Sequence, residues 1–166
     1  MREEILKILQ SKWKYKSFRP LQEDIIISVI SGKDTLALMP TGGGKSLCYQ
    51  VPALYLEGIT LVITPLIALM KDQVLNLHQK NINASAIHSG MNSMEVSNII
   101  SNCIYGKTKL LYVSPERLQS SSFQQRLLEL EIRLIAVDEA HCISQWGHDF
   151  RPAYRKIHEL RNKFKD

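Results

Sequence analysis

The stretch from Asp34 to Gln50, DTLALMPTGGGKSLCYQ, is the strongest indication of the fold in this sequence. An apolar run, Leu36 to Met39, precedes Pro40 and three consecutive glycines, and a Lys-Ser pair then leads into a segment with helical spacing. Glycine adopts backbone angles that residues with a Cβ avoid, so successive N–H groups can face one anion. The stretch therefore predicts a strand, a phosphate-binding loop and a helix, in that order.

The loop carries side chains suited to a nucleotide and its metal ion. The N-terminus of the predicted helix adds partial positive charge. We expect Lys45 to reach the β and γ phosphates and Ser46 to bind Mg²⁺. Met39 stands where the usual pattern begins with glycine, and a purely structural glycine-rich turn is the alternative. The residues of this stretch expected to bind nucleotide are Thr41, Gly42, Gly43, Gly44, Lys45 and Ser46.

Length and composition indicate a globular protein of one domain. The chain has 166 residues, of which 45% are hydrophobic and 22% are charged. These values are ordinary for soluble globular domains. No apolar run approaches the roughly 20 residues that span a bilayer, and the N-terminus lacks the apolar core of a signal peptide. We therefore expect a cytoplasmic protein that makes no membrane contact.

Charge and cysteine content restrict the partners of the chain. The net charge of +5 permits a polyanionic partner, and basic residues concentrate near both ends of the sequence. A solvated basic face explains the charge equally well. The cysteines, Cys48, Cys103 and Cys142, are widely spaced. This spacing favours reduced structural thiols over a zinc site.

Apolar runs alternate with helical patterns along the chain. Beyond the loop, strands are predicted at Ile59–Pro65, Asn83–Ile87, Lys109–Pro115 and Arg133–Val137. This alternation is typical of an open, mostly parallel α/β sheet with helices on both faces. Helices are predicted at Glu3–Gln10, Leu21–Ser31, Lys45–Tyr55, Leu66–Lys80, Met94–Ile104, Phe123–Leu130 and Ala153–Phe164.

Two acidic residues directly follow the last predicted strand, where open α/β sheets bind their ligands. Paired with a phosphate loop, Asp138 would hold Mg²⁺ opposite Ser46. Glu139 would orient or deprotonate the water that attacks the γ phosphate, and His141 would relay the nucleotide state to neighbouring segments. Acidic residues that serve only as charges at a helix start are the alternative.

Five segments of the chain form a series of motifs. They are FRPLQ (Phe18–Gln22), MPTGGGKSLCYQVPAL (Met39–Leu54), VITPLIALMKDQV (Val62–Val74), YVSPERL (Tyr112–Leu118) and DEAHCISQWGHDFRPAY (Asp138–Tyr154). The sequence and the order of these motifs resemble the first RecA-like domain of a superfamily 2 DNA helicase, and specifically the RecQ family. The last motif is the most specific, because it joins an acidic motif to an aromatic-rich loop that general D-E-x-H helicases lack.

The resemblance implies a RecA-like P-loop NTPase fold and a 3′–5′ ATP-dependent DNA helicase that acts in recombination and repair. Tyr15 and Arg19 would sandwich the adenine ring, and Gln22 would read its polar edge. Lys14 stands where the family often has glycine. The residues implied to contact single-stranded DNA, by stacking and by phosphate contact, are Trp146, Phe150 and Arg151. The residues expected to be catalytic, from the phosphate loop and the acidic motif, are Lys45, Asp138, Glu139 and His141.

The resemblance further implies that residues 1–166 are a single N-terminal RecA-like domain, truncated before a Thr-Ala-Thr motif and a second RecA-like domain. An arginine supplied opposite the γ phosphate is worth roughly 10³ to 10⁵ in rate. Without that arginine, we expect nucleotide binding but slow hydrolysis. The expected partners are single-stranded or partially duplex DNA and the second RecA-like domain. The alternatives are a stand-alone nucleotide- or nucleic-acid-binding module and an RNA helicase of the same superfamily.

Overall fold

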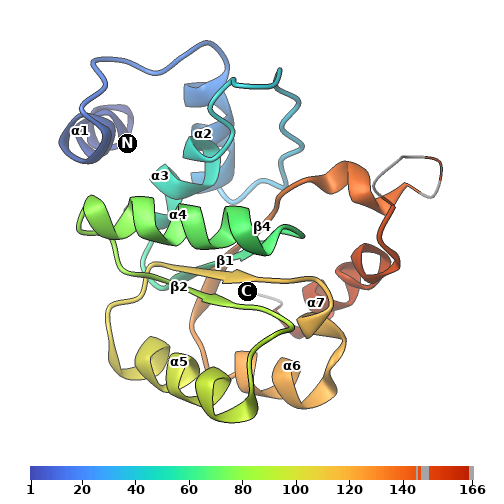
Figure 1. The fold of residues 1–166 in the computed structure, drawn as a ribbon. Coiled ribbons are helices and arrows are strands. Elements are labelled where there is room, and N and C mark those ends of the chain that lie inside the picture. The colour runs from blue at the N-terminus through green and yellow to red at the C-terminus, as the bar shows by residue number, and fades with distance from the viewer. Residues whose placement is uncertain (145, 147–149, 165–166) are drawn as a thin grey trace. The chain divides into compact units, whose positions relative to one another are not determined.

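The computed structural model describes residues 1–144, 146 and 150–164 (Figure 1). It divides into two compact units, Met1–Glu57 and Gly58–Asp166. Each unit contains a hydrophobic cluster of its own. None of the described helices is long and apolar enough to cross a membrane.

The first unit is built from three helices, α1 (Arg2–Trp13), α2 (Gln22–Ile30) and α3 (Leu47–Tyr55). Each was predicted from apolar residues repeated at helical spacing, and each is confirmed. The repeated residues face one another, because burying a shared apolar stripe stabilises short helices that would be marginal alone. The buried cluster of this unit consists of Ile5, Leu9, Ile26, Leu47 and Val51.

The segment before the phosphate loop is not a strand, so the strand predicted at Leu36 to Met39 is wrong. Residues 33–40 have no regular structure, and Leu36 and Leu38 are 79% and 78% exposed. A strand requires a hydrogen-bonded neighbour for its N–H and C=O groups. Among the described residues, the sheet contains four strands, all from the second unit. The apolar run therefore lacks the partner that would turn an extended segment into a strand.

The second unit contains a four-stranded sheet with the order β2-β3-β1-β4, and every pair of neighbours is parallel (Figure 1). All residues of β1 are buried, because β1 lies between two strands and helices cover both faces. In contrast, β4 is only partly buried. The strands are β1 (Ile59–Ile63), β2 (Ala84–Ile87), β3 (Leu110–Val113) and β4 (Ile132–Val137).

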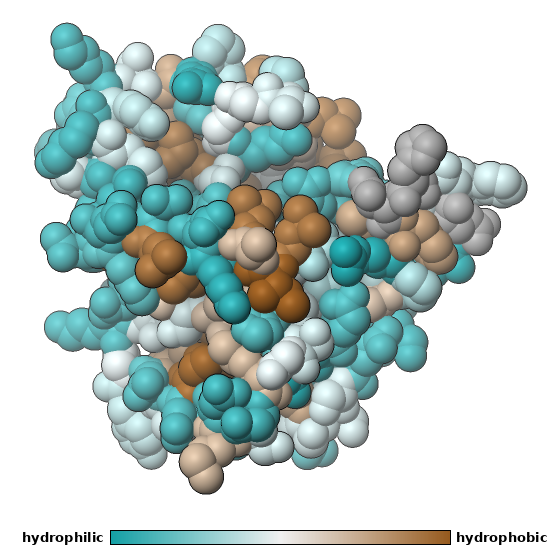
Figure 2. Space-filling view, in the orientation of Figure 1, coloured by the Kyte–Doolittle hydropathy of each residue, from teal (hydrophilic) through white to brown (hydrophobic). Residues whose placement is uncertain are grey.

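Helices lie on both faces of this sheet, which confirms the predicted α/β class. Figure 1 shows α4 (Ile67–Gln79) on one face and α5 (Ser93–Tyr105) and α6 (Ser121–Leu127) on the other. The larger buried cluster joins α5 and α6 to alternate residues of the strands. Apolar side chains also reach the surface among hydrophilic ones (Figure 2), and Leu75 of α4 is one that is exposed.

Short helical turns connect the remaining parts of the second unit. They are η1 (Arg117–Gln119), η2 (Ala140–Ile143) and η3 (Pro152–Lys156). The predicted final helix, Ala153–Phe164, is divided into η3 and α7 (His158–Lys163). Leu160 of α7 is buried in the same cluster as α5 and α6, so the C-terminal segment packs against the sheet unit.

Candidate functional site

The glycine-rich segment forms a tight loop in front of α3. The N–H of Gly43 donates to the carbonyl of Pro40 at 3.0 Å, and the N–H of Leu47 donates to the carbonyl of Gly44 at 3.2 Å. Gly42 and Gly44 both have a φ of +77°, which lies in the left-handed region that favours glycine. The predicted loop and the helix that follows it are therefore present, without the preceding strand.

This loop fits an anion. Within the part of the chain that the structure describes, the N–H groups of Gly44 and Lys45 donate to no acceptor. Both groups lie just before the N-terminus of α3, where the helix adds partial positive charge. Lys45 is exposed, and none of the ion pairs among the described residues involves its ammonium group. Ser46 is the N-cap residue of α3.

Two of the three residues predicted to bind adenine contact the loop itself. The guanidinium of Arg19 donates to the carbonyl of Gly42 at 2.6 Å. The side-chain amide of Gln22 donates to the carbonyls of Gly43 and Gly44 at 3.3 and 3.1 Å. Tyr15, the third, is half exposed. The structure therefore brings Arg19 and Gln22 to the phosphate loop, a contact that the sequence did not predict.

The acidic motif lies at the carboxyl end of β4, as predicted. The N–H of Asp138 donates to the carbonyl of Ile63 at 2.9 Å, which continues the pairing of β4 with β1. The N–H of Glu139 donates to Oδ1 of Asp138 at 3.0 Å, and Oε2 of Glu139 lies 3.3 Å from Nδ1 of His141. Asp138, Glu139 and His141 therefore form one connected group in the second unit.

Glu139 has an unusual backbone. Its φ and ψ are 52° and 43°, in the left-handed region, which costs a residue with a side chain roughly 1 to 2 kcal/mol. Strained residues of this kind concentrate at functional sites. The strained backbone of Glu139 is thus in keeping with a functional role, and the sequence around Glu139 does not reveal this strain.

The carboxyl edge of the sheet also carries two buried hydroxyl groups. Ser114 follows β3, Thr64 follows β1 and Asp138 follows β4, so the strand order places Thr64 between the other two. Neither hydroxyl has a hydrogen-bond partner among the described residues. A buried polar group without a partner is costly. This edge therefore contains polar groups that the described protein atoms do not satisfy.

The aromatic-rich segment presents its tryptophan to solvent. Trp146 is 91% exposed, which argues against a core role. Phe150 is half buried, and the guanidinium carbon of Arg155 lies 5.2 Å from its ring centroid, in the range of a cation–π contact. Nη1 of Arg151 lies 3.3 Å from Oε1 of Glu116. The predicted residues Trp146, Phe150 and Arg151 therefore belong to one surface segment, whereas the residues between Trp146 and Phe150 lie outside the described chain.

Tyr154 is a residue of this region to which the sequence assigned no role. It is buried, and its hydroxyl donates to the backbone carbonyl of Asp138 at 2.8 Å. Burial raises the pKa of the Tyr154 hydroxyl above its usual value, which keeps the hydroxyl protonated and able to donate. The only feature of the sequence that could have indicated a role for Tyr154 is its place at the end of the aromatic-rich run. Tyr154 links that segment to the acidic motif.

Replacing Tyr154 tests the strength of this link. Tyr154→Phe removes only the hydroxyl, and it leaves the carbonyl of Asp138 without its donor. We expect the free energy of unfolding of the chain to fall by about 1 to 2 kcal/mol, measured by urea denaturation. Tyr105→Phe is the control, because Tyr105 is exposed on α5. Equal midpoints for Tyr154→Phe and the wild type would show that the hydrogen bond does not hold the acidic motif.

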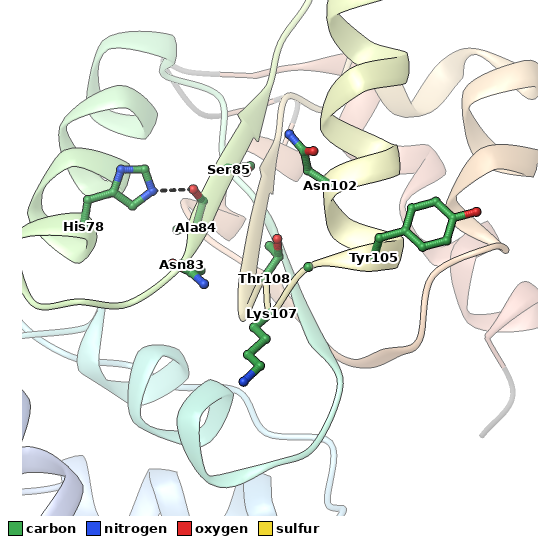
Figure 3. Close-up of a pocket in the computed structure, with 9 residues that line it drawn as sticks. His78, Asn83, Ala84, Ser85, Asn102, Tyr105, Lys107 and Thr108 are labelled. Atoms are coloured by element: carbon green, nitrogen blue, oxygen red, sulfur yellow. Dashed lines mark hydrogen bonds between the residues drawn. The ribbon is translucent and has the colours of Figure 1, made fainter.

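A cavity of about 430 Å³ opens at the amino ends of β2 and β3, at the opposite edge of the sheet from Asp138 (Figure 3). Nε2 of His78 lies 2.7 Å from the carbonyl of Ala84, and Tyr105 and Lys107 extend in different directions. None of the residues predicted to be functional lines this cavity. Its lining residues are His78, Asn83, Ala84, Ser85, Asn102, Tyr105, Gly106, Lys107 and Thr108.

The described residues offer no preformed cage for a metal ion. No group of three or more His, Cys, Asp or Glu side chains lies close enough together among them to hold one. Mg²⁺ is usually bound by one or two carboxylates together with substrate phosphates and water. Ser46 and Asp138 therefore fit the ligand type that Mg²⁺ prefers, each within its own unit.

Comparison with known proteins relates the chain to helicases. "ATP-dependent DNA helicase RecQ" of Haemophilus influenzae is 48% identical over 161 residues, which are 97% of this chain and 26% of that protein. The protein of the same name from Bacillus subtilis is 48% identical over 160 residues, which are 96% of this chain and 27% of that protein. The chain thus spans about a quarter of the length of these relatives.

A solved structure shares the fold of this chain, and a family profile assigns the family. The structure of a hypothetical ATP-dependent RNA helicase from Sulfolobus tokodaii has a TM-score of 0.64 and 22% identity, covering 86% of this chain and 43% of that one, and it supports the fold alone. The profile described as DEAD/DEAH box helicase matches residues 19–165. Because this match includes the loop, the acidic motif and the whole sheet, the chain belongs to the DEAD/DEAH box helicase family.

Proposed function

We propose that this chain is the ATP-binding motor domain of a 3′–5′ ATP-dependent DNA helicase that acts in recombination and repair. The observation that carries the proposal is the phosphate loop, whose Gly44 and Lys45 N–H groups have no acceptor among the described residues. Support for a DNA substrate comes from the relatives named ATP-dependent DNA helicase RecQ, which match nearly the whole chain. The location in the cytosol stays a prediction.

In this proposal, the loop and Lys45 bind the phosphates of ATP, and Ser46 and Asp138 hold Mg²⁺. When bound there, Mg²⁺ would neutralise charge on the phosphate oxygens. Glu139 orients or deprotonates the attacking water. The distance of 3.3 Å between the carboxylate of Glu139 and the imidazole of His141 supports a role of His141 in relaying the nucleotide state to neighbouring segments. Thr41, Gly42 and Gly43 complete the phosphate-binding segment.

The remaining predicted residues select the base and the nucleic acid. Tyr15, Arg19 and Gln22 bind adenine, which favours ATP over GTP. Single-stranded or partially duplex DNA binds at the aromatic-rich segment, where the exposed ring of Trp146 is suited to stacking on a base. Phe150 and Arg151 belong to the same segment and contribute to this contact.

We place the two compact units in one N-terminal RecA-like domain, which works against a second RecA-like domain in a longer protein. The relatives are about four times the length that this chain matches, which supports a longer protein. Alone, the chain should turn ATP over slowly, because an arginine from a partner domain is worth roughly 10³ to 10⁵ in rate. A fast, DNA-stimulated ATPase activity of the isolated chain would contradict this part of the proposal.

The affinity of Lys45→Ala for nucleotide tests the proposed site. Loss of a charged hydrogen-bond donor costs about 1.5 to 3 kcal/mol. We therefore expect the Kd for a fluorescent ADP analogue in the presence of Mg²⁺ to rise roughly 10- to 150-fold. Lys33→Ala removes the same charge from an exposed residue before the loop and should leave the Kd nearly unchanged. Equal affinities for the wild type and Lys45→Ala would exclude the nucleotide assignment.

The nucleic acid is tested separately from the nucleotide. Stimulation of ATP hydrolysis in the full-length protein should be strong with single-stranded DNA and weak with RNA of the same length and sequence. Stronger stimulation by RNA would favour the RNA helicase alternative. No stimulation by either, together with retained ADP binding, would favour a stand-alone nucleotide-binding module.

A further inference from the structure

The side chain of Gln22 is committed to the phosphate loop. It is 1% exposed, and both of its amide contacts on the donor side are carbonyls of the loop, Gly43 at 3.3 Å and Gly44 at 3.1 Å. An amide NH₂ group has two donors, so the described contacts use its donor capacity in full. Gln22 is therefore occupied by the loop before any base is bound.

The orientation of the Gln22 amide is fixed by Arg19. The backbone N–H of Arg19 donates to Oε1 of Gln22 at 2.9 Å, so the oxygen of the amide faces the donor and the nitrogen faces the loop. The guanidinium of Arg19 holds the preceding carbonyl, that of Gly42, at 2.6 Å. Arg19 and Gln22 together thus donate hydrogen bonds to three successive carbonyl groups of the loop.

Binding these carbonyls also sets the direction of the N–H groups. A trans peptide unit is planar, and its C=O and N–H point in opposite directions. The carbonyl of Gly43 shares a peptide unit with the N–H of Gly44, and the carbonyl of Gly44 shares one with the N–H of Lys45. These are the two N–H groups for which the described residues provide no acceptor. When Gln22 binds the two carbonyls, both N–H groups turn away from it.

The close approach of Gln22 depends on glycine at position 44. A Cβ on Gly44 would lie 2.4 Å from Nε2 of Gln22, which is too short for any such contact. The loop and Gln22 are therefore matched: the glycine leaves room for the amide, and the amide orients the peptide units on both sides of the glycine. This contact lies entirely within the first unit.

We propose that Gln22 is a positioning residue of the phosphate-binding loop, which aims the Gly44 and Lys45 N–H groups at the phosphate anion. This role is additional to any contact with adenine, and it rests on the proposed function because the anion is taken to be a nucleotide phosphate. It makes a prediction that base recognition alone does not: Gln22 affects the binding of a phosphate ligand that carries no base.

Pyrophosphate is the probe that separates the two roles. Gln22→Met keeps the length of the side chain and removes both donors. We expect it to weaken the binding of Mg²⁺-pyrophosphate to the chain, measured by calorimetry, by about 5- to 30-fold, and to weaken ADP at least as much. A Gln22 that reads only the base would leave the pyrophosphate affinity unchanged, and that result would overturn the proposal.

Two comparison variants make the result interpretable. Gln10→Met makes the same substitution at an exposed position of α1 and should leave pyrophosphate affinity unchanged. Lys45→Ala should weaken pyrophosphate strongly. If Lys45→Ala weakens it and Gln22→Met does not, the proposal fails and the proposed function stands. If the wild type binds ADP but not pyrophosphate, the proposal also fails. If the wild type binds neither ADP nor pyrophosphate, both the Gln22 proposal and the proposed function fail.

Amide NMR distinguishes a misfolded Gln22→Met variant from a folded one whose phosphate loop has lost its orientation. In the wild type, pyrophosphate should shift the amide proton signals of Gly44 and Lys45 downfield, because both N–H groups gain an acceptor. In Gln22→Met these shifts should shrink while the signals of α1 and of the α3 residues beyond its first turn stay in place. Full shifts of both amides in Gln22→Met would overturn the proposal, because the loop would then orient itself without Gln22.

Discussion

Gly44→Ala should lower the free energy of unfolding of the chain by about 2 to 4 kcal/mol, measured by urea denaturation followed by circular dichroism. Two costs add. A residue with a Cβ at a φ of +77° loses roughly 1 to 2 kcal/mol. The new Cβ would also meet Nε2 of Gln22 at 2.4 Å, and moving that amide away gives up hydrogen bonds worth about 1 to 2 kcal/mol.

Gly42→Ala is a control that the loop itself provides. Gly42 has the same φ of +77°, but no atom lies within 4 Å of the position of its Cβ. This variant should therefore show only the backbone cost of about 1 to 2 kcal/mol. The difference between the two variants measures the crowding against Gln22. Equal losses would show that the amide moves aside without cost, and would contradict a tight fit between Gln22 and the loop.

Glu139→Gln should slow ATP hydrolysis roughly 10²- to 10⁴-fold, because a general base contributes this much to the rate. The change keeps the size of the side chain and removes its ability to accept a proton. Single-turnover hydrolysis, with protein in excess over ATP and single-stranded DNA present, measures the effect in the full-length protein. Nucleotide affinity should change little, since the proposed role of Glu139 is toward the water rather than the phosphates.

Two further variants bracket this result. Glu159→Gln, at an exposed position of α7, should hydrolyse ATP at the rate of the wild type. Glu139→Gly should also be inactive, yet its unfolding midpoint should not fall, because glycine relieves the left-handed backbone and an exposed ion pair contributes little. Hydrolysis by Glu139→Gln at the rate of the wild type would exclude Glu139 as the base.

Most of the fold could be predicted because its elements are encoded in local patterns. The strand β1 is a continuous run of apolar residues, and all of them are buried. The helices α2 and α4 repeat apolar residues at helical spacing, and their ends fall within one residue of the predicted limits. In each case, the information lies in neighbouring residues, and packing against the rest of the unit only selects which face is buried.

The segment from Leu36 to Met39 could not be predicted in the same way. Its apolar run is as strand-like as others in the chain, but a strand also needs a neighbour, which a local pattern does not specify. The contacts of Gln22 and Tyr154 were missed for a related reason. Gln22 meets the loop and Tyr154 meets Asp138 across many intervening residues. Such contacts follow from tertiary packing and leave no periodic signal.

The strand β4 has a consequence for how the chain behaves in a concentrated sample. Among the described residues, β4 pairs with β1 alone, and its other edge has no strand beside it. Its sequence, Ile132 to Val137, is apolar apart from Arg133, which is unusual for a strand with no strand beside one of its edges. Such an edge is a template for the addition of an extended segment from another molecule. We therefore expect colloidal stability to depend on whether repulsion from the net charge of +5 outweighs strand addition at β4.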